Sequence, residues 1–415
     1  MKFLCIDSGL YLELCNALSD KGKHTVYYYT NTGLAFPRFQ DIATGNKFEY
    51  VTKVQSFWKY VDEVDVVCNF DVGANDAIDY IRKKYPDKSV FGAGQAEKLE
   101  MNRLGFKKTL EALDLPCIPY KVIKGMDALR KYLETHPKQV VKADSSIRGD
   151  FETLKCDDYK SVKQILDDRA PLLGLYAEEC QFIVEDMVEC KSESGYDGFF
   201  SNGVYIPFSY GIEYDKNLYI GKVIKTEDDV PEVLMETLDA FRPVLDKFGY
   251  RGALSTEERI VSEKEHYFID PCCRGPLPLG VLYSRFINNW PDLVYSIGKG
   301  EPIEVDCDYK YVGAFALCTT NTKEHFTLVQ MDEGHRDDFR FMMACQNEKK
   351  DYYAVKGQEA SVVVVAGGDS PEDVIKKLKK NADYVHAFGL ENDAIKSIDG
   401  ILEKIKEAEE VGIDF

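Results

Sequence analysis

The stretch STEERIVSEKEHYFIDPCCRGP, residues 255–276, predicts two strands joined by a tight turn. Each strand carries a carboxylate among Ile, Tyr and Phe residues, Glu257 in the first and Asp270 in the second, and the second strand leads into Arg274. Acidic residues are rarely buried in strands without a partner, and hard divalent cations take oxygen ligands. A two-residue turn at 263–264 would place the two carboxylates opposite each other on one face. This hairpin is therefore a candidate cation site.

Two other interpretations of the hairpin stay open. A turn of three or five residues would pair Glu258 instead of Glu257 with the second strand. A surface hairpin also often carries acidic residues without binding anything. The hairpin alone does not decide between these interpretations, so the rest of the chain has to be considered with it.

The size and charge of the chain limit its function. A chain of 415 residues is too long for one ordinary core, so two to four domains are expected. With 45% hydrophobic and 30% charged residues, the chain is globular and not disordered. The net charge of −19 argues against a nucleic-acid or anionic membrane surface, which needs a basic footprint. A small anionic ligand can still bind in a locally basic cleft.

The 12 cysteines show no zinc-type spacing, and the adjacent pair Cys272 and Cys273 disfavours a local disulfide. Residues 1–7 indicate a strand and not a signal peptide. No apolar run approaches the roughly 18 residues that span a bilayer. We therefore expect reduced thiols, most of them in the core, and a cytoplasmic location.

The first 92 residues alternate strand and helix patterns, which predicts a small parallel sheet. Strands are expected at 2–6, 25–29, 64–68 and 89–91, and helices at 10–18 and 74–84. Gly92 and Gly94 weakly resemble a dinucleotide-binding loop, but the third glycine of that motif is missing.

The central region carries two lysines of interest. Residues 94–114 predict one helix, on which Arg103, Lys107 and Glu111 form a stripe that would ordinarily be a solvated face. A strand at 139–143 contains Lys142, and the small, polar residues after it form either a phosphate-covering loop or an ordinary hairpin turn. Further elements are expected as strands at 121–123 and 181–188, helices at 126–134, 232–248 and 281–297, and short strands up to about residue 219.

The last third of the chain reads as β-rich, with its clearest strand at 360–366 and a charged amphipathic helix at 392–410. The glycine pair before Ser370 could suggest a phosphate loop. Ser370 as N-cap, Pro371 at the first helical position and Asp373 at the third favour a plain helix start instead.

The order of these features resembles the ATP-grasp ligases, and within them the phosphoribosylamine–glycine ligases, over most of the chain. The order is a helix lysine (Lys107), a strand-end lysine (Lys142), a loop of small residues, a carboxylate-bearing hinge strand at 184–188 and the acid–acid–arginine hairpin of residues 255–276. No single motif is decisive, but their joint order and spacing are.

The resemblance implies an α/β (α+β) chain with the ATP-grasp fold. It implies a parallel-sheet pre-ATP-grasp domain at 1–93 and an ATP-grasp domain at 94–300. The latter would contain a lid subdomain at about 118–188 and a large subdomain at about 189–300. A small β-rich domain with terminal helices would follow at 301–415.

The same resemblance assigns roles to individual residues. Glu257 and Asp270 would hold Mg²⁺ or Mn²⁺, and Arg274 would be catalytic by holding the acyl phosphate or the substrate carboxylate. The two lysines would neutralise the α- and β-phosphates of ATP, loop amides would cover the β- and γ-phosphates, the hinge would bind adenine and a glutamate would bind the ribose. The implied ATP-binding residues are Lys107, Lys142, Ser145, Ser146, Gly149, Glu185, Asp186, Met187, Val188 and Glu193.

The implied activity is an ATP-dependent carboxylate–amine ligase that forms an acyl phosphate and releases ADP and phosphate. Its partners would be a small carboxylate and an amine, with no nucleic acid and no membrane, and a homodimer stays open. Three departures from the family pattern matter: Cys272 replaces an Asn, and neither a Gly-Lys-Gly phosphate loop nor the glycine-rich block that meets phosphoribosylamine is found. Phosphoribosylamine–glycine ligase itself and a non-catalytic ATP-binding sensor or assembly protein therefore remain as alternatives.

Overall fold

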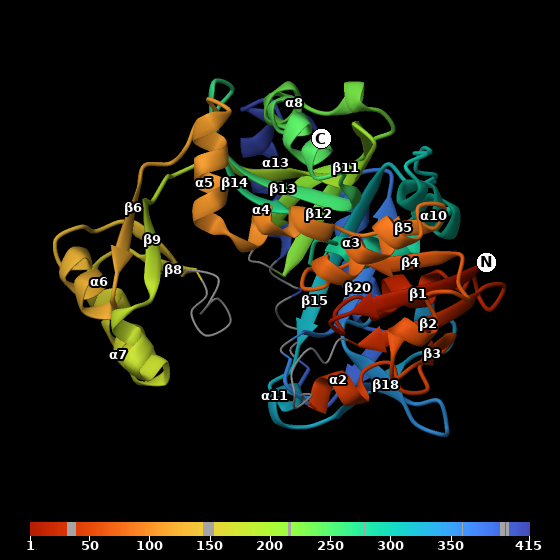
Figure 1. Cartoon of the computed structure of the whole chain (residues 1–415). Coiled ribbons are helices and arrows are strands. Elements are labelled where there is room, and N and C mark those ends of the chain that lie inside the picture. Colours follow the sequence, from red (N-terminus) through yellow and green to blue (C-terminus); the bar gives the residue numbers. More distant parts are fainter. Residues whose placement is uncertain are drawn as a thin grey trace.

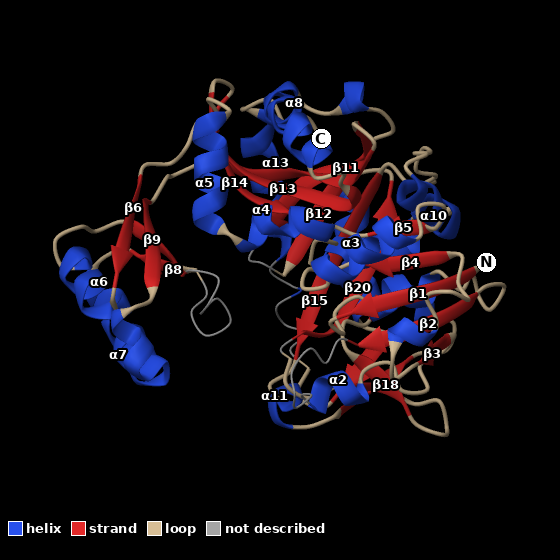
Figure 2. Cartoon of the chain, viewed as in Figure 1, coloured by secondary structure: helices blue, strands red, loops and turns tan. Residues whose placement is uncertain are grey.

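The computed structural model has a mixed α/β fold, which confirms the expected fold class (Figures 1 and 2). Its described residues form one parallel sheet and three further sheets in which every strand pairing is antiparallel. The described residues are those of 1–415 outside the ranges 31–38, 144–152, 215–216, 278, 359, 391–394 and 396–397. None of the helices in this described part is both long and apolar enough to cross a membrane.

The N-terminal sheet is parallel throughout, as the alternating pattern predicted, with the strand order β3-β2-β1-β4-β5. Its central strands are almost completely buried, which suits a parallel sheet covered on both faces. The elements of this part are β1 (Lys2–Asp7), α1 (Leu12–Ala17), β2 (Thr25–Thr30), α2 (Phe39–Ala43), β3 (Val51–Lys53), β4 (Val66–Asn69), α3 (Asn75–Lys84) and β5 (Ser89–Phe91).

The segment predicted as the lid contains a separate antiparallel sheet, ordered β6-β9-β7-β8, with two helices and its own hydrophobic cluster. We keep the name lid for this sheet and its two helices. Figure 1 shows it standing to one side of the rest of the chain. Its helix at 159–173 was not predicted, although Asp158 and Ser161 form a capping box at its start. The elements are β6 (Tyr120–Lys124), α6 (Met126–Leu133), β7 (Gln139–Ala143), β8 (Leu154–Cys156), α7 (Tyr159–Leu173) and β9 (Gln181–Asp186).

The largest sheet has the order β14-β13-β10-β11-β12-β15-β20-β17 in the described residues. It contains two long strands where several short ones were expected, and it continues past residue 300. The division into domains at that residue therefore stays a prediction. The strands are β10 (Ser192–Ser201), β11 (Val204–Tyr214), β12 (Leu218–Val223), β13 (Arg251–Ser262), β14 (Glu265–Cys272), β15 (Tyr311–Cys318), β17 (Phe339–Arg340) and β20 (Ala360–Gly368).

A small antiparallel sheet and several helices complete the fold. Ser370 Oγ accepts a hydrogen bond from the Asp373 amide at 3.2 Å, which confirms the plain helix start after β20. The sheet has the order β18-β19-β16-β21. The remaining elements are α8 (Glu232–Lys247), α11 (Asn321–Glu324), β16 (Thr327–Met331), β18 (Ala344–Gln346), β19 (Tyr352–Ala354), α12 (Pro371–Ala382), β21 (Val385–Ala387) and α13 (Ile401–Glu409).

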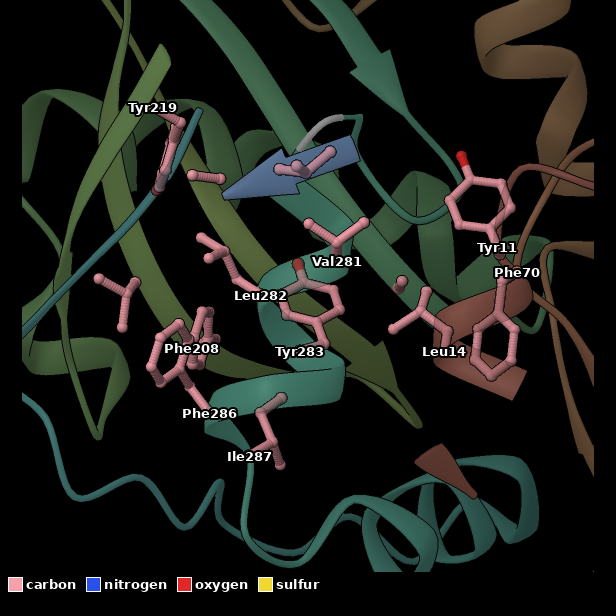
Figure 3. Packing of buried hydrophobic residues seen from close by; sticks show 14 of the residues in the cluster. Tyr11, Leu14, Phe70, Phe208, Tyr219, Val281, Leu282, Tyr283, Phe286 and Ile287 are labelled. Carbon is pink, nitrogen blue, oxygen red and sulfur yellow. The ribbon is translucent and has the colours of Figure 1, made fainter. Parts of the chain in front are cut away.

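The main core runs between the N-terminal sheet and the largest sheet. Figure 3 shows Tyr283 and Phe286 beside Phe208 of β11, and the rings of Tyr283 and Phe208 lie 5.2 Å apart between centroids. The helix expected at 281–297 is divided into η6 (Leu279–Leu282), α9 (Tyr283–Phe286) and α10 (Trp290–Lys299). Pro291 has no amide proton to donate to the preceding turn, so a helix cannot continue through it from α9. Proline is favourable in the first turn of a helix, and α10 begins at Trp290.

The helix expected at 94–114 is also interrupted, and this break positions a site residue. It consists of η2 (Gly94–Glu97), α4 (Lys98–Met101) and α5 (Arg103–Ala112). Asn102 caps α5, because its Oδ1 accepts a hydrogen bond from the Gly105 amide at 2.8 Å. In α5 the Arg103 and Lys107 side chains are buried and Glu111 is exposed, so the interpretation as a solvated face was wrong for the two cations.

The close approach of β10 and β13 gives a prediction about stability. A Cβ atom on Gly195 would lie 1.6 Å from the Thr256 carbonyl oxygen, which is rigid backbone. We expect Gly195→Ala to destabilise the protein by about 3 kcal/mol or more. The control is Gly252→Ala on the neighbouring strand, where the nearest atom would lie at an ordinary 3.4 Å. Urea unfolding midpoints compare the two variants, and similar midpoints would contradict the prediction.

Candidate active site

The β13–β14 hairpin has the predicted register. Glu257 pairs with Asp270, and Ser262 pairs with Glu265 across the two-residue turn. Between these pairs the register shifts by one residue and then returns, through irregularities at 257–258 and 260–262. The two shifts compensate each other, so the interpretation that paired Glu257 with Asp270 is confirmed.

The bulge also separates two adjacent glutamates. Glu258 is fully buried, and its Oε2 accepts a hydrogen bond from Thr237 Oγ1 at 3.0 Å and contacts His266 Nδ1 at 2.9 Å. It therefore has a structural role against α8. Glu257 instead lines a cavity together with Asp270.

This cavity, of about 530 Å³, lies between the lid and the largest sheet. The lid contributes side chains from β7, β8 and β9, and the sheet contributes side chains from β10, β11, β13 and β14. Acidic and basic groups dominate its lining: Lys142, Lys155, Glu185, Glu193, Glu213, Glu257, Arg259 and Asp270. We call it the interdomain cavity.

Three carboxylates crowd one wall of the interdomain cavity. Burial raises the pKa of Glu257 well above its usual range, and the neighbouring Glu193 and Asp270 raise it further, while Lys142 acts in the opposite direction. Such like-charge crowding is relieved by a divalent cation.

The wall suits Mg²⁺ better than a metal held by protein ligands alone. Among the residues that the structure describes, no group of three His, Cys, Asp or Glu side chains is arranged to hold a metal. Mg²⁺ characteristically takes one or two carboxylates and completes its shell with water and substrate phosphates. Burial raises the pKa of the Cys272 thiol, so this residue stays a neutral thiol and a poor ligand for a hard cation.

Two lysines meet on one glutamate at the lid side of the cavity. Lys107 Nζ lies 2.6 Å from Glu185 Oε1, and Lys142 Nζ lies 3.4 Å from Glu185 Oε2. All three side chains are buried, and together they carry one net positive charge. Lys142 and Glu185 come from the paired strands β7 and β9, and Lys107 reaches them from α5. The three side chains thus form a buried, ordered cluster with a net positive charge.

The other predicted ATP-binding residues are only partly tested by this geometry. Asp186, Met187 and Val188 follow Glu185, but none of them lines the interdomain cavity. The Met187 amide donates to the Lys138 carbonyl at 2.9 Å, and Asp186 Oδ1 accepts from Gln139 Nε2 at 3.0 Å. The predicted loop residues Ser145, Ser146 and Gly149 lie outside the described residues.

Arg274 lines a neighbouring cavity of about 180 Å³ that shares Glu193, Glu213 and Glu257 with the interdomain cavity. Its Nε donates to Glu100 Oε1 at 2.9 Å, and its Nη1 donates to Tyr11 Oη at 3.2 Å. Nη2 makes no hydrogen bond with any described residue. These contacts fix the plane of the guanidinium and leave one nitrogen for a ligand.

Sequence reasoning missed several cavity residues. Arg259 follows Glu257 by two residues on the same strand, and its Nε lies 3.6 Å from Glu193 Oε2, so strand alternation could have identified it. Lys155 lines the cavity from β8. Glu213 and Glu100 had no local signal, because they reach the site through strand pairing and helix packing far from the hairpin.

A buried carboxyl among the lining residues of the smaller cavity, of about 180 Å³, gives a prediction about pH. Asp197 is 3% exposed and accepts a hydrogen bond from Tyr219 Oη at 2.7 Å. Burial raises the pKa of Asp197 to about 7, above its value of 3.8 in an unperturbed chain. Between pH 3.8 and about 7 the Asp197 carboxyl is ionised in the unfolded chain and protonated in the folded chain. The contribution of Asp197 to the free energy of unfolding is therefore complete at low pH and is lost as the pH rises through about 7.

We expect Asp197→Asn to reduce the loss of stability between pH 4 and 7 by a few kcal/mol, since one pKa unit corresponds to about 1.4 kcal/mol. Asn can still accept the hydrogen bond from Tyr219. The measurement is the urea unfolding midpoint against pH, with Asp168→Asn on the exposed face of α7 as the control. Parallel pH profiles for the wild-type chain and Asp197→Asn would contradict the prediction.

Comparison with solved structures gives matches over nearly the whole chain. A phosphoribosylamine–glycine ligase from Thermotoga maritima has a TM-score of 0.69 at 14% identity, over 94% of this chain and 98% of its own. The biotin carboxylase domain of 2-oxoglutarate carboxylase from Hydrogenobacter thermophilus, in complex with MgADP, ADP and bicarbonate, has a TM-score of 0.67 at 11% identity, over 99% and 98%. N5-carboxyaminoimidazole ribonucleotide synthetase from Thermotoga maritima has a TM-score of 0.61 at 11% identity, over 93% and 99%.

No protein-family model matches the sequence, and comparison with curated protein sequences gave no match. At identities this low, structural likeness defines the fold and leaves the substrates open. The neighbours are ATP-grasp ligases, as the order of motifs predicted. The chain therefore has the ATP-grasp fold.

Proposed function

We propose that the protein is an ATP-dependent ligase that joins a small carboxylate to an amine through an acyl phosphate, releasing ADP and phosphate. One observation carries this proposal. Lys142, Glu185, Glu257 and Asp270 line the same interdomain cavity, and Lys107, which does not line it, is paired with Glu185. A triphosphate would supply negative charge to the lysine wall, and its divalent cation would supply positive charge to the carboxylate wall.

In this proposal Lys107 and Lys142 exchange part of their contact with Glu185 for the α- and β-phosphates of ATP. Glu257 and Asp270 would hold Mg²⁺ or Mn²⁺, which would neutralise charge on the transferred phosphoryl group. Glu193 would bind the ribose hydroxyls, with Arg259 holding its carboxylate. Catalysis would depend mainly on positioning and electrostatic stabilisation.

Arg274 is the proposed catalytic residue, because a guanidinium fits two oxygens of a carboxylate or an acyl phosphate. The Glu100 and Tyr11 contacts keep it oriented, and Nη2 is available to a ligand. The substrate carboxylate would attack the γ-phosphorus, and the uncharged amine would then displace phosphate from the acyl carbon. The adjacent cavity of about 180 Å³ is the proposed place for these substrates.

The test is the release of ADP and phosphate from ATP and Mg²⁺ over a matrix of carboxylates and amines. The matrix includes glycine with phosphoribosylamine, because one structural neighbour bears that name. We expect ADP release that requires one carboxylate and one amine together. ATP binding without release for any pair would overturn the ligase proposal.

The altered metal strand supports a second candidate, an ATP-binding sensor or assembly protein without turnover. Cys272 is a neutral thiol in a position where the resembling ligases carry an Asn that can bind a metal. This candidate predicts ATP binding in a calorimeter and no ADP under any substrate mixture. Slow, amine-dependent formation of ADP would exclude it.

A further inference from the structure

A larger cavity, of about 650 Å³, lies between the N-terminal sheet domain and the C-terminal part of the chain. Its walls come from α1 and the turn after it, from the α9–α10 junction and from residues 336–352. It shares no lining residue with the two cavities of the candidate active site. Its volume is within the range of about 300–1,000 Å³ that is typical of small-molecule pockets. We call it the α1 cavity.

The α1 cavity contains a buried guanidinium without a carboxylate partner. Arg340 is 6% exposed, and no carboxylate of the described residues lies within 4.0 Å of it. Its Nε donates to Ser284 Oγ at 3.0 Å, and its Nη1 donates to the carbonyls of Phe339 and Asp337 at 2.6 and 3.2 Å. Nη2, with two N–H groups, makes no hydrogen bond with any described residue. Burial of a cation without a counter-ion is unfavourable.

Two acids of the cavity lining, Glu13 and Glu49, are already paired with another arginine. Arg336 Nη2 lies 2.7 Å from Glu13 Oε1, and Arg336 Nε lies 2.7 Å from Glu49 Oε1. Glu49 also accepts a hydrogen bond from Tyr352 Oη at 2.5 Å. Glu13 and Glu49 are thereby held on Arg336, and neither lies within ion-pair distance of Arg340.

The rim of the α1 cavity adds two exposed cations, Lys21 and Lys350. Neither forms an ion pair with a described residue. The lining Asp20 is paired with Lys23, at 2.7 Å. Asp337 accepts a hydrogen bond from Arg340 through its carbonyl, and its carboxylate lies beyond ion-pair distance of Arg340. Among the described residues of the lining, three cations thus have no ion pair, against one acid, Asp337. In a chain of net charge −19, this local excess of positive charge is a feature that solubility does not require.

We propose that the α1 cavity binds a small anion that carries phosphate or carboxylate groups. Arg340 Nη2 contacts the anionic group inside the cavity, and Lys21 and Lys350 attract it at the rim. Arg340 is held rigidly by Ser284 and the two carbonyls, so little side-chain freedom is lost on binding. This site is independent of the proposed ligase activity, because its binding groups are not those of the interdomain cavity.

The test is calorimetric titration with inorganic pyrophosphate, and separately with citrate, at fixed ionic strength. The titrations use a chain carrying Lys142→Met, which weakens anion binding in the interdomain cavity. We expect Arg340→Gln in this background to weaken binding of the preferred anion by at least about tenfold. The Lys142→Met chain that keeps Arg340 should still bind the anion, although its interdomain cavity is impaired. Failure of the ligase proposal would leave this binding unchanged, so the two proposals are tested separately. The stronger of the two anions distinguishes a phosphate ligand from a carboxylate ligand.

Two adjacent lysines provide a matched pair in case Arg340→Gln does not fold. Lys350 lines the cavity and Lys349 does not, although both are exposed. We expect Lys350→Gln to weaken binding about threefold and Lys349→Gln to leave it unchanged. Absence of binding of both anions would overturn the proposal, and so would binding that neither Arg340→Gln nor Lys350→Gln changes. A dimer in sedimentation that Lys350→Gln dissociates would also overturn it, by assigning this face to a second copy of the chain.

Discussion

Replacing Asp270 by Asn is expected to lower the rate of ADP release by at least about 100-fold without unfolding the protein. The side chain keeps its size but loses the charge that a hard cation requires. Removing one group that stabilises charge in a transition state typically lowers the rate by a factor of about 100–1,000. The loss should be partly overcome by higher Mg²⁺ or Mn²⁺ concentrations, because the cation affinity is what changes.

The same substitution should lower activity but leave the stability of the protein unchanged or raise it. Asp270 is one of the two carboxylates whose charge raises the pKa of Glu257, so its neutralisation removes repulsion from a buried group. Without divalent cation at neutral pH, Asp270→Asn should therefore unfold at the same urea concentration as the wild-type chain or a higher one. A loss of activity that came from misfolding would show a lower midpoint.

Glu258→Gln is the matched contrast, because Glu258 adjoins Glu257 but points to the other side of the sheet. It should destabilise the chain by about 1–3 kcal/mol through its contacts with Thr237 and His266. It should leave the dependence of turnover on Mg²⁺ nearly unchanged at low temperature. Full turnover by Asp270→Asn at low Mg²⁺ would show that the hairpin does not hold the cation.

The hairpin was predictable from sequence because its register depends on local features. The polar turn at 263–264 and the apolar alternation on both sides fix which residues face each other. The two compensating bulges were not predictable, since they depend on how β13 packs against β10 and α8. The break between α4 and α5 at Asn102 had a local signal in its capping residue, but burial of Lys107 depends on packing against the lid.

Long-range pairings account for the rest of what the sequence did not reveal. The side chain of Glu185 was expected only as part of an adenine-binding hinge, and its contacts with Lys107 and Lys142 arise from tertiary packing. The pairing of β15 with β12, which extends the largest sheet past residue 300, joins strands about 90 residues apart. A strand pattern indicates that a segment pairs, but it does not identify the partner.

Replacing Lys142 by Met is expected to weaken ATP binding by at least about 30-fold, or roughly 2 kcal/mol. The substitution keeps an unbranched apolar side chain in a buried position, so the lid sheet should be retained. It changes the net charge of the buried trio from +1 to zero, because Glu185 stays paired with Lys107 at 2.6 Å. A triphosphate then meets a neutral wall where a positive one stood, and charge in a desolvated site is weakly screened.

Three ligands test whether charge is the cause. The loss of affinity in Lys142→Met should be largest for ATP, smaller for ADP and absent for adenosine, measured by calorimetry at one ionic strength. Lys107→Met should follow the same order, because its ammonium contacts the same carboxylate. The control is Lys108→Met, on the exposed side of the same helix turn, which should bind all three ligands as the wild-type chain does. An equal loss for adenosine and ATP would mean that the lysines shape the lid and do not bind phosphate, and the interdomain cavity would lose its assignment as the nucleotide site.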